Sequence, residues 1–246
     1  MTRFQASRIH LGISAAVVGT ALAIVFLLWY PGPAFEIAGA ITPVLVLIGV
    51  DLVLGPLLTL IVYKHGKPGL KFDLAFIAAV QLVALFYGSF TLYSERPHFL
   101  VFAVDRVALV AEKHIDTALI SYESLTEKSF GRLTNVFARK PEDREEFQRF
   151  LDSVLFEGMP DLERRTEYWE PWESGSEIIR SAITSLDDFE PASELEREEL
   201  ADAIARHGRE HPRLGLIPIG GIEEDLGMLM DQDSLLPLDV IRVNPW

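Results

Sequence analysis

The sequence predicts a membrane protein with an N-terminal region of three transmembrane helices and a C-terminal periplasmic α+β domain. Three apolar stretches lie within residues 1–93, and each is long enough to cross a bilayer as a helix. Only five of the 22 Lys and Arg residues and three of the 36 Asp and Glu residues lie in this part, so residues 94–246 carry the acidic excess. In residues 94–246, strand-like patterns come early and late, and helix-like patterns lie between them. We therefore expect two domains, 1–93 in the membrane and 94–246 outside it.

The three predicted spans are 9–30, 37–63 and 74–93. The first follows basic residues, as a secretory signal peptide would, but the apolar region of a signal peptide is only about 7–15 residues long. This stretch is longer and ends in Trp29 and Tyr30, which are typical of a membrane interface. We interpret it as a retained helix.

The distribution of lysine and arginine predicts the orientation of the helices. Arg3 and Arg8 precede the first span, and Lys64, Lys67 and Lys71 lie between the second and the third. The loop PGPAFE between the first two spans has neither residue type. Short loops rich in Lys and Arg stay in the cytoplasm. We expect a cytoplasmic N-terminus and a C-terminal domain on the other side of the membrane, which in a bacterium is the periplasm.

Residues 94–246 are long enough to bury a modest core. Runs rich in apolar and β-branched residues predict strands, and helical spacing of apolar residues predicts helices. The expected strands are 99–104, 107–110, 214–219, 226–230 and 240–243, and the expected helices are 141–156, 176–186 and 193–207.

The composition excludes several classes of function. The chain has no cysteine, which excludes disulfides and thiol chemistry. Its acidic C-terminal part would repel phosphate backbones, so we expect no nucleic-acid partner. His207 to His211 fit the zinc-protease pattern H-x-x-E-H, but Gly208 and Pro212 indicate a helix end there instead of a rigid metal-binding helix. We expect no metal, no cofactor and no enzymatic activity; the alternative is a membrane-tethered periplasmic hydrolase that uses His207 and His211.

Trp169 and Trp172 belong to an aromatic cluster, YWEPW. Such residues are favoured at protein interfaces, and they are also common core anchors. Both alternatives stay open, with core packing favoured.

Asp51 is the only charged residue in the predicted second span. A charged aspartate at the centre of a membrane helix costs about 2.5–3.5 kcal/mol, so it needs a polar partner. Counting depth from the membrane surface makes Gln81 or Tyr87 of the third span the candidate partner. Gly55 permits close helix approach, and Pro56 frees the backbone carbonyl of Leu52, next to Asp51.

Three roles are open for Asp51. It can tie the second and third spans together, it can contact a helix of another protein, or it can relay protons or ions. A relay usually needs a chain of ionisable groups.

Several strings resemble a known family: WYPGP at 29–33, GVDLVLGPLLTLIV at 49–62, KFDLAFIAAVQLVALFYG at 71–88, VDR at 104–106 and NPW at 244–246. They are similar to the type IV pilin accessory proteins of the TfpX/TfpZ type. The resemblance covers roughly residues 1–110. It implies an inner-membrane chaperone or assembly factor for a type IV pilin, whose membrane helix and periplasmic head it would contact. It also marks Asp105 and Arg106 as signature residues of the periplasmic part.

Overall fold

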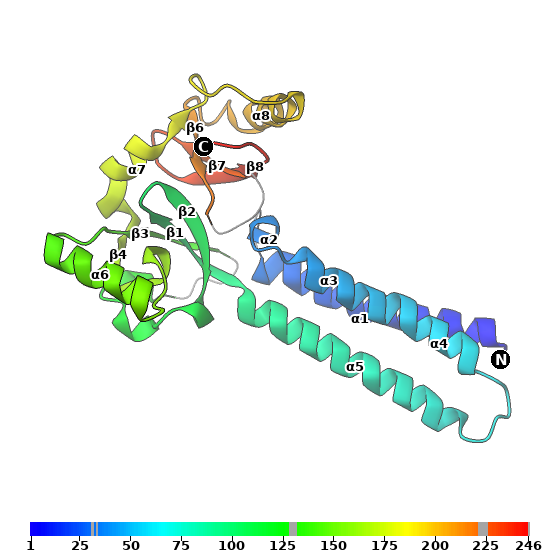
Figure 1. The fold of residues 1–246 in the computed structure, drawn as a ribbon. Coiled ribbons are helices and arrows are strands. Elements are labelled where there is room, and N and C mark those ends of the chain that lie inside the picture. Colours follow the sequence, from blue (N-terminus) through cyan, green and yellow to red (C-terminus); the bar gives the residue numbers. More distant parts are fainter. Residues whose placement is uncertain (31, 33, 128–131, 221–225, 246) are drawn as a thin grey trace. The chain divides into compact units, whose positions relative to one another are not determined.

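The structure is a computed structural model that describes residues 1–246 except 31, 33, 128–131, 221–225 and 246 (Figure 1). Pro31, Pro33 and Trp246 of the signature strings therefore lie outside the described residues. The chain forms two compact units. The helical unit comprises residues 1–31 and 39–96, and the C-terminal unit comprises residues 97–246 together with the short segment 32–38.

The helical unit contains three long helices. The first is α1 (Arg3–Ile24), continued by a π-helical turn η1 (Val25–Trp29). The second runs from Ile41 to Val62 as α3 (Ile41–Ile48), a π-helical segment η2 (Gly49–Leu54) and α4 (Gly55–Val62). The third is α5 (Leu70–Glu95). All three are long and apolar enough to cross a membrane.

Local signals explain where these helices begin. Thr2 caps α1 through a capping box with Gln5, which satisfies backbone N–H groups of the first turn. Gly69 precedes α5 with φ 79°, a left-handed conformation that favours glycine. Lys67 and Asp73 form a 2.7 Å ion pair across this turn. The predicted helix starts at residues 37 and 74 are displaced to Ile41 and Leu70, and at Leu70 the turn at Gly69 and not the apolar composition sets the end.

Contacts between aromatic and backbone groups join α1 to the end of α5. The Tyr30 hydroxyl donates a hydrogen bond to the carbonyl oxygen of Leu92 at 2.9 Å. The rings of Trp29 and Tyr93 meet edge to face with centroids 5.3 Å apart.

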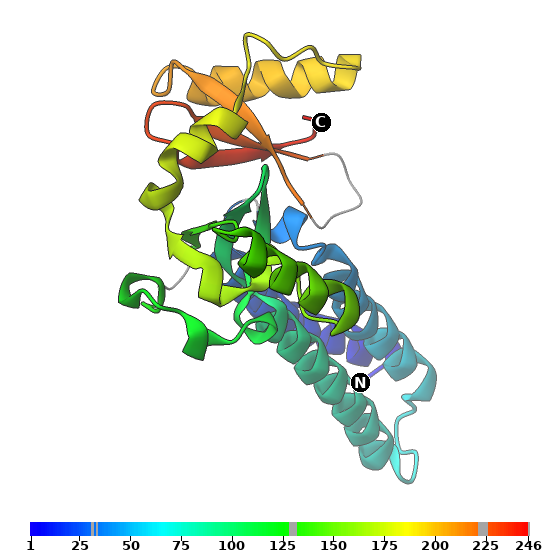
Figure 2. The same cartoon turned by 60° about the vertical axis from the view of Figure 1, so that its left-hand side comes forward.

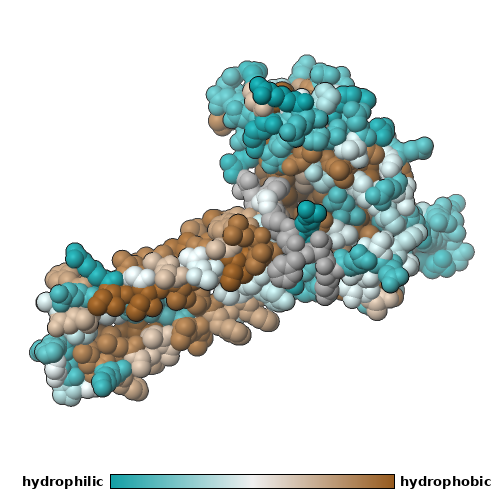
Figure 3. All heavy atoms as spheres, turned by 180° about the vertical axis from the view of Figure 1, so that it is seen from behind, coloured by the Kyte–Doolittle hydropathy of each residue, from teal (hydrophilic) through white to brown (hydrophobic). Residues whose placement is uncertain are grey.

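The helical unit exposes large apolar side chains along its length, as the brown surface in Figure 3 shows. Leu27, Val83 and Phe86 are examples, each about 70% exposed or slightly more. Only 11% of the most apolar window of α5 is buried within the protein. A surface of this kind is unusual for a protein in water.

The C-terminal unit contains two four-stranded sheets. The first has the order β2-β1-β3-β4, with β1 (Pro97–Ala103), β2 (Arg106–Ala111), β3 (Thr134–Ala138) and β4 (Trp169–Pro171). Within it, β1 is antiparallel to β2 and parallel to β3. The second has the order β5-β6-β7-β8 and is antiparallel, with β5 (Thr184–Ser185), β6 (Leu214–Pro218), β7 (Gly227–Asp231) and β8 (Pro237–Ile241).

Three helices complete the C-terminal unit: α6 (Arg144–Phe156), α7 (Ser176–Ala182) and α8 (Glu194–His207). Figures 1 and 2 show α6 on the first sheet and α8 on the second. One-turn helix α2 (Ala34–Ile37) also belongs to this unit, since Ile37 is part of its core.

Alternate side chains of β1 point into two different hydrophobic cores. Leu100 and Phe102 point into a core shared with Met228 and Met230 of the second sheet. Phe99, Val101 and Ala103 point to the other face, where they pack with residues such as Phe150 of α6. Both faces of β1 are thus buried, which explains its nearly continuous apolar sequence.

The observed elements confirm the α+β character of this unit and refine the predicted ones. Helix α6 begins at Arg144 and not at Pro141, because the Asp143 side chain accepts hydrogen bonds from the N–H groups of Glu145 and Glu146. The helix predicted over 176–186 ends at Ala182, and β5 follows it. The last strand begins at Pro237, inside a stretch predicted to be a turn.

Candidate functional site

The helical unit contains a buried layer of polar side chains from all three long helices. We call it the polar layer: Ser7 and His10 of α1, Asp51 of η2, Thr59 of α4 and Gln81 of α5. His10 Nδ1 lies 2.5 Å from Thr59 Oγ1, and His10 Nε2 lies 2.8 Å from Gln81 Oε1. The Gln81 amide donates a 3.2 Å hydrogen bond to the backbone carbonyl of Asp51. These contacts link residues as far apart in sequence as positions 10 and 81.

The partners of Gln81 fix the direction of every hydrogen bond in the chain. A backbone carbonyl can only accept, so the Gln81 nitrogen must face Asp51 and the Gln81 oxygen must face His10. That oxygen can also only accept, so His10 Nε2 carries a hydrogen. A neutral imidazole then accepts at Nδ1 from the Thr59 hydroxyl. The network thus has a complete solution with no charge on His10, which suits an apolar environment.

Pro56 explains why Gln81 bonds a backbone carbonyl. In η2 the winding is π-helical, and the N–H of Gly55 bonds the carbonyl of Val50, five residues earlier. The next donor in this pattern would be residue 56, which is proline and has no N–H. The carbonyl left without a helical donor is that of Asp51, and the Gln81 amide supplies one. The freed carbonyl was expected at Leu52, four residues before Pro56; the π-helical winding moves it to Asp51.

A further carbonyl near the same proline is also satisfied by a side chain. The Ser7 hydroxyl donates a 2.9 Å hydrogen bond to the carbonyl oxygen of Pro56. The second helix is therefore bonded at its irregular segment by both of its neighbours, α1 and α5.

Gly55 makes room for the Gln81 amide. A Cβ atom at position 55 would lie 2.1 Å from Gln81 Nε2, far inside van der Waals contact. The same test at Gly49, six residues earlier in the same helix, finds nothing within 4 Å. The predicted close approach at Gly55 is confirmed, and its reason is the polar layer.

The carboxyl group of Asp51 is the exception in this network. Asp51 is 5% exposed, and its Oδ2 atom is buried with no hydrogen-bond partner in the part of the chain that the structure describes. The bond from Gln81 to the Asp51 carbonyl would form with any residue at position 51. The tie between the second and third helices therefore includes the backbone of residue 51, and it leaves the Oδ2 atom of the carboxyl group without a partner among the described residues.

The candidate partners of Asp51 have different outcomes. Gln81 is confirmed as the residue of α5 that contacts position 51. Tyr87 as a partner is wrong: its side chain is 72% exposed and lies outside the polar layer. Depth alone could not separate the two, because residues 81 and 87 lie on different faces of α5.

Sequence reasoning missed His10, Thr59 and Ser7. They are small or neutral polar residues in apolar stretches, and only Asp51 stood out by its charge. A search by depth would have pointed to Thr20 of the first span, because His10 is only the second residue of the predicted span 9–30.

In the C-terminal unit, Asp105 and Arg106 lie at the tip of the β1–β2 hairpin. The Arg106 guanidinium donates a 2.9 Å hydrogen bond to Asp105 Oδ1, and the Arg106 stem packs on Gly220. Val104 before them has φ 64°, and the N–H of Asp105 bonds the carbonyl of Ala103 at 2.8 Å. This is a three-residue turn that a β-branched residue adopts only under strain. The signature residues thus mark a tight, strained tip that presents Asp105 to the surface.

Trp169 and Trp172 are core residues. Trp169 is 1% exposed and packs against Phe99, with ring centroids 4.8 Å apart. Trp172 lies between the two sheets and donates from Nε1 to the Leu235 carbonyl at 2.9 Å. As interface candidates they are therefore not placed to meet a partner, and the core-packing alternative describes both.

His207 and His211 contact different carboxylates. His207 ends α8 and lies 3.2 Å from Asp239 of β8, whereas His211 lies 3.1 Å from Asp231 at the end of β7. The segment is a helix end, as Gly208 and Pro212 predicted. Among the described residues, no group of three or more side chains has the arrangement of a metal site.

The carboxyl group of Asp231 is held by several donors. Burial alone would raise its pKa, but hydrogen bonds from the Ser234 hydroxyl, the Asp233 N–H and His211 outweigh burial and lower the pKa below the ordinary aspartate value. It fixes the turn between β7 and β8 and is structural.

Comparison with known proteins identifies the family. Residues 1–39 match the model of "Fimbrial assembly protein FimB". Three fimbrial assembly proteins of Dichelobacter nodosus are similar to the chain. That of serogroup I is 34% identical over 44% of this chain and 43% of its own length, so less than half of that relative is matched. That of serogroup E1 is 27% identical over 81% of this chain and 79% of its own length.

The protein of serogroups C1 and C2 is 33% identical over 44% of this chain and 85% of its own length. No solved structure matches the chain significantly. The match to most of a relative's length, together with the N-terminal family match, agrees with the resemblance found in the sequence. The chain belongs to the FimB family of fimbrial assembly proteins, a family of accessory proteins for type IV pilus assembly.

Proposed function

We propose that this protein is a non-enzymatic accessory protein of the bacterial inner membrane that holds or stabilises a type IV pilin before it enters the pilus. The observation that carries the proposal is a bundle of three apolar helices, joined by one buried polar layer, in a member of the fimbrial assembly family. The pilin is the partner because assembly of a fimbria acts on its subunits.

A membrane location accounts for the surface of the helical unit. Its exposed side chains are mostly Leu, Ile, Val and Phe, which would associate in water but are at home in lipid. Each helix satisfies its own backbone, and the irregular turn around Pro56 is satisfied by Ser7 and Gln81. The three spans would carry the C-terminal unit to the side opposite Arg3, Arg8 and the loop of three lysines, which is the periplasm.

This layout offers a pilin two places of contact. A pilin anchored by one apolar helix could pack on the exposed helices in the bilayer, and its head could meet the acidic C-terminal unit outside. Helix association in lipid depends on close packing and on polar contacts, since lipid and leucine are equally apolar. The large exposed face of α5 is available for such packing.

Deletion and complementation in the native bacterium test the proposal. We expect deletion to lower the level of pilin, or the number of surface pili, and the full chain to restore them. A photocrosslinker at Val83 on the exposed face of α5 should capture pilin, whereas one at the buried Ile77 should capture much less. Unchanged pilin and unchanged piliation after deletion, with no pilin captured, would show that the proposal is wrong.

A further inference from the structure

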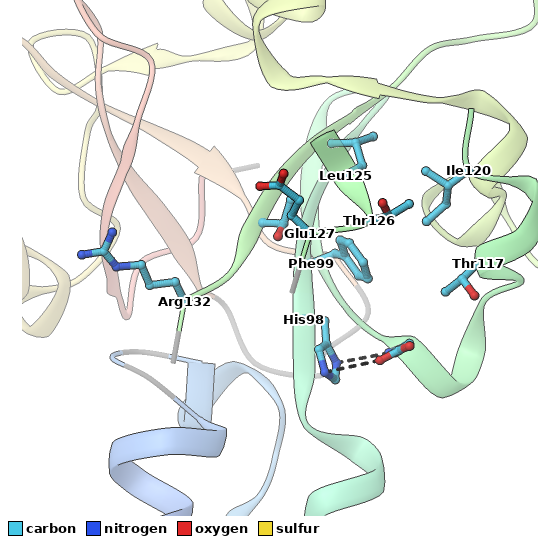
Figure 4. Close-up of a pocket in the computed structure, with 10 residues that line it drawn as sticks. His98, Phe99, Thr117, Ile120, Leu125, Thr126, Glu127 and Arg132 are labelled. Carbon is cyan, nitrogen blue, oxygen red and sulfur yellow. Dashed lines mark hydrogen bonds and ion pairs between the residues drawn. The ribbon is translucent and has the colours of Figure 1, made fainter. Parts of the chain in front are cut away.

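A cavity of about 260 Å³ opens in the C-terminal unit, on the face of the first sheet that also carries α6 (Figure 4). Its apolar wall consists of Phe99 from β1 and of Ile120 and Leu125 from the connection between β2 and β3. Phe99 and Leu125 are buried members of the core on this face, and Ile120 packs against that core. The wall is therefore held in place by the fold.

Polar or charged groups form the rest of the described lining: His98, Glu112, Thr117, Thr126, Glu127, Arg132 and Thr134. His98 Nε2 and Glu112 Oε2 lie 3.6 Å apart, and the N–H of Glu112 donates to His98 Nδ1 at 3.5 Å. Because Nδ1 accepts, Nε2 of the neutral ring carries the hydrogen that faces the carboxylate. Thr117 also lines the cavity, and in Figure 4 it lies on the same side as Ile120, across from Phe99. An apolar wall beside fixed polar groups is a feature of ligand sites.

The cavity has the size of a large side chain. Engineered cavities of roughly 150 Å³ in other proteins bind benzene, so this one has room for an aromatic, leucine or methionine side chain. Such a side chain, buried in a pocket, is the usual anchor of a protein interface.

The place of the cavity in the chain indicates where its ligand comes from. His98 and Phe99 follow Glu95, the last residue of α5, by three and four residues. A chain advances at most about 3.6 Å per residue, so His98 lies within roughly 11 Å of the end of α5. If α5 crosses the membrane, a step that rests on the proposed function, the cavity residue His98 lies close to the membrane surface.

We propose that the cavity receives one bulky apolar side chain of the pilin, from the segment that directly follows its membrane helix. That segment is the part of a membrane-anchored subunit that must pass at this height above the bilayer. His98, Glu112 and Thr117 at the rim would hydrogen-bond to the backbone beside the anchor. An anionic lipid headgroup is disfavoured, because Glu112 and Glu127 outweigh Arg132 in the lining and the unit as a whole is acidic.

Photocrosslinking in piliated cells tests the occupant. Benzoylphenylalanine replaces Ile120 in the full chain, and in a matched control it replaces the neighbouring Leu119, which is half exposed and does not line the cavity. We expect pilin adducts at position 120 to exceed those at position 119 about tenfold, as for an interface anchor. Lipid adducts at position 120, adducts with other proteins only, or equal pilin yields at both positions would overturn the proposal.

A variant that fills the cavity tests this proposal independently of the proposed function. Thr117→Phe should lower the pilin adduct at Val83 of α5 about tenfold and reduce surface pili, while Leu119→Phe should change neither. Thermal unfolding shows whether Thr117→Phe folds. If it does not fold, Ile120→Glu replaces it in the test, because it places a charge in the cavity at a half-buried position. Normal piliation in a folded, filled variant would overturn the cavity proposal alone, because deletion of the gene reports separately on the proposed function.

Discussion

At the scale of single residues, Gln81 is the centre of the polar layer because it bonds both neighbouring helices. Gln81→Leu removes the bonds to His10 and to the Asp51 carbonyl and leaves both groups unpaired in an apolar bundle. Hydrogen bonds between membrane helices contribute on average about 0.6 kcal/mol, so we expect a loss of about 1 kcal/mol. The midpoint of unfolding of the full chain in SDS measures it.

Tyr87 provides the control for this variant. It lies on α5 six residues from Gln81, but its side chain is exposed and outside the polar layer. Tyr87→Leu should leave the SDS midpoint unchanged. If both variants lowered it equally, the polar layer would not be what joins the helices.

Asp51 should behave differently from Gln81. Its carboxyl oxygen Oδ2 is buried without a partner, and the tie to α5 uses its backbone. We expect Asp51→Leu to keep or raise the SDS midpoint, because it removes a polar group that costs about 2.5–3.5 kcal/mol at a helix centre. We also expect it to reduce surface pili, whereas Asp51→Asn, which keeps a hydrogen-bonding side chain, should reduce them less.

The two measurements on Asp51 separate its possible roles. A lower SDS midpoint in Asp51→Leu would assign the carboxyl group to the internal tie. Normal piliation together with a normal midpoint would leave the carboxyl group without a role in either the bundle or pilus assembly.

Asp231 gives the C-terminal unit a dependence on pH. Its pKa is lower in the folded protein than in the unfolded chain, so the folded state binds fewer protons in this range. The stability that Asp231 contributes is present above its unfolded pKa of about 3.9 and is lost as the pH falls through its lower folded pKa. Thermal unfolding of the full chain between about pH 5 and pH 2 should show this loss, and Asp231→Asn should flatten the curve. Equal slopes for both chains would contradict the assignment.

At the scale of helices, Gly55 and Gln81 form one fitted contact between α4 and α5. Gly55→Ala places a methyl group 2.1 Å from the Gln81 amide nitrogen, and the amide must leave its bonds to His10 and Asp51. We expect a loss of stability in SDS of about 1 kcal/mol, similar to Gln81→Leu. Gly49→Ala, with open space around the new methyl group, should not lower stability.

A double variant tests whether these two residues act through the same contact. Once Gln81→Ala has removed the amide, Gly55→Ala meets no obstacle from that side chain. The two effects should then be smaller together than their sum, as expected for residues in contact. Additive effects would show that Gly55 acts independently of Gln81.

The elements that sequence predicted are those with a strong local pattern. The apolar spans, β1, β2 and α8 all have one, and Ser193 marks the start of α8 as an N-cap. By contrast, β4 has only three residues and includes Pro171, which an edge strand tolerates. β3 has buried residues on both faces, so its sequence TNVFA lacks alternation. β3 forms because β1 offers it a partner, and β4 forms because β3 does, which a local pattern cannot show.

Sequence predicted only part of the polar layer, because the rest depends on local winding and on tertiary contacts. Asp51, Gly55, Pro56 and Gln81 stood out by chemistry, and they do lie together. The role of the Asp51 backbone depends on the π-helical winding before Pro56, which changes the freed carbonyl from residue 52 to residue 51. His10 joins them only because α1 packs beside α4, a tertiary contact that the separate spans did not reveal.

At the scale of the whole molecule, the distribution of Lys and Arg predicts how the three helices are oriented across the bilayer. The chain has no cysteine, so single cysteines can be introduced without other substitutions. His65→Cys lies in the exposed loop between α4 and α5 and keeps its three lysines; Glu198→Cys lies on the exposed face of α8. If positive charge sets the topology, position 65 is cytoplasmic and position 198 periplasmic.

A membrane-impermeant maleimide that crosses the outer membrane should therefore label Glu198→Cys in intact cells and His65→Cys only after the inner membrane is opened. Replacing Lys64, Lys67 and Lys71 with glutamine should weaken this preference, because Arg3 and Arg8 would then be the only Lys or Arg residues before Arg96 to hold the orientation. Labelling of position 65 in intact cells would reverse the topology. The C-terminal unit and its cavity would then face the cytoplasm, where a pilin head exported to the periplasm could not reach them.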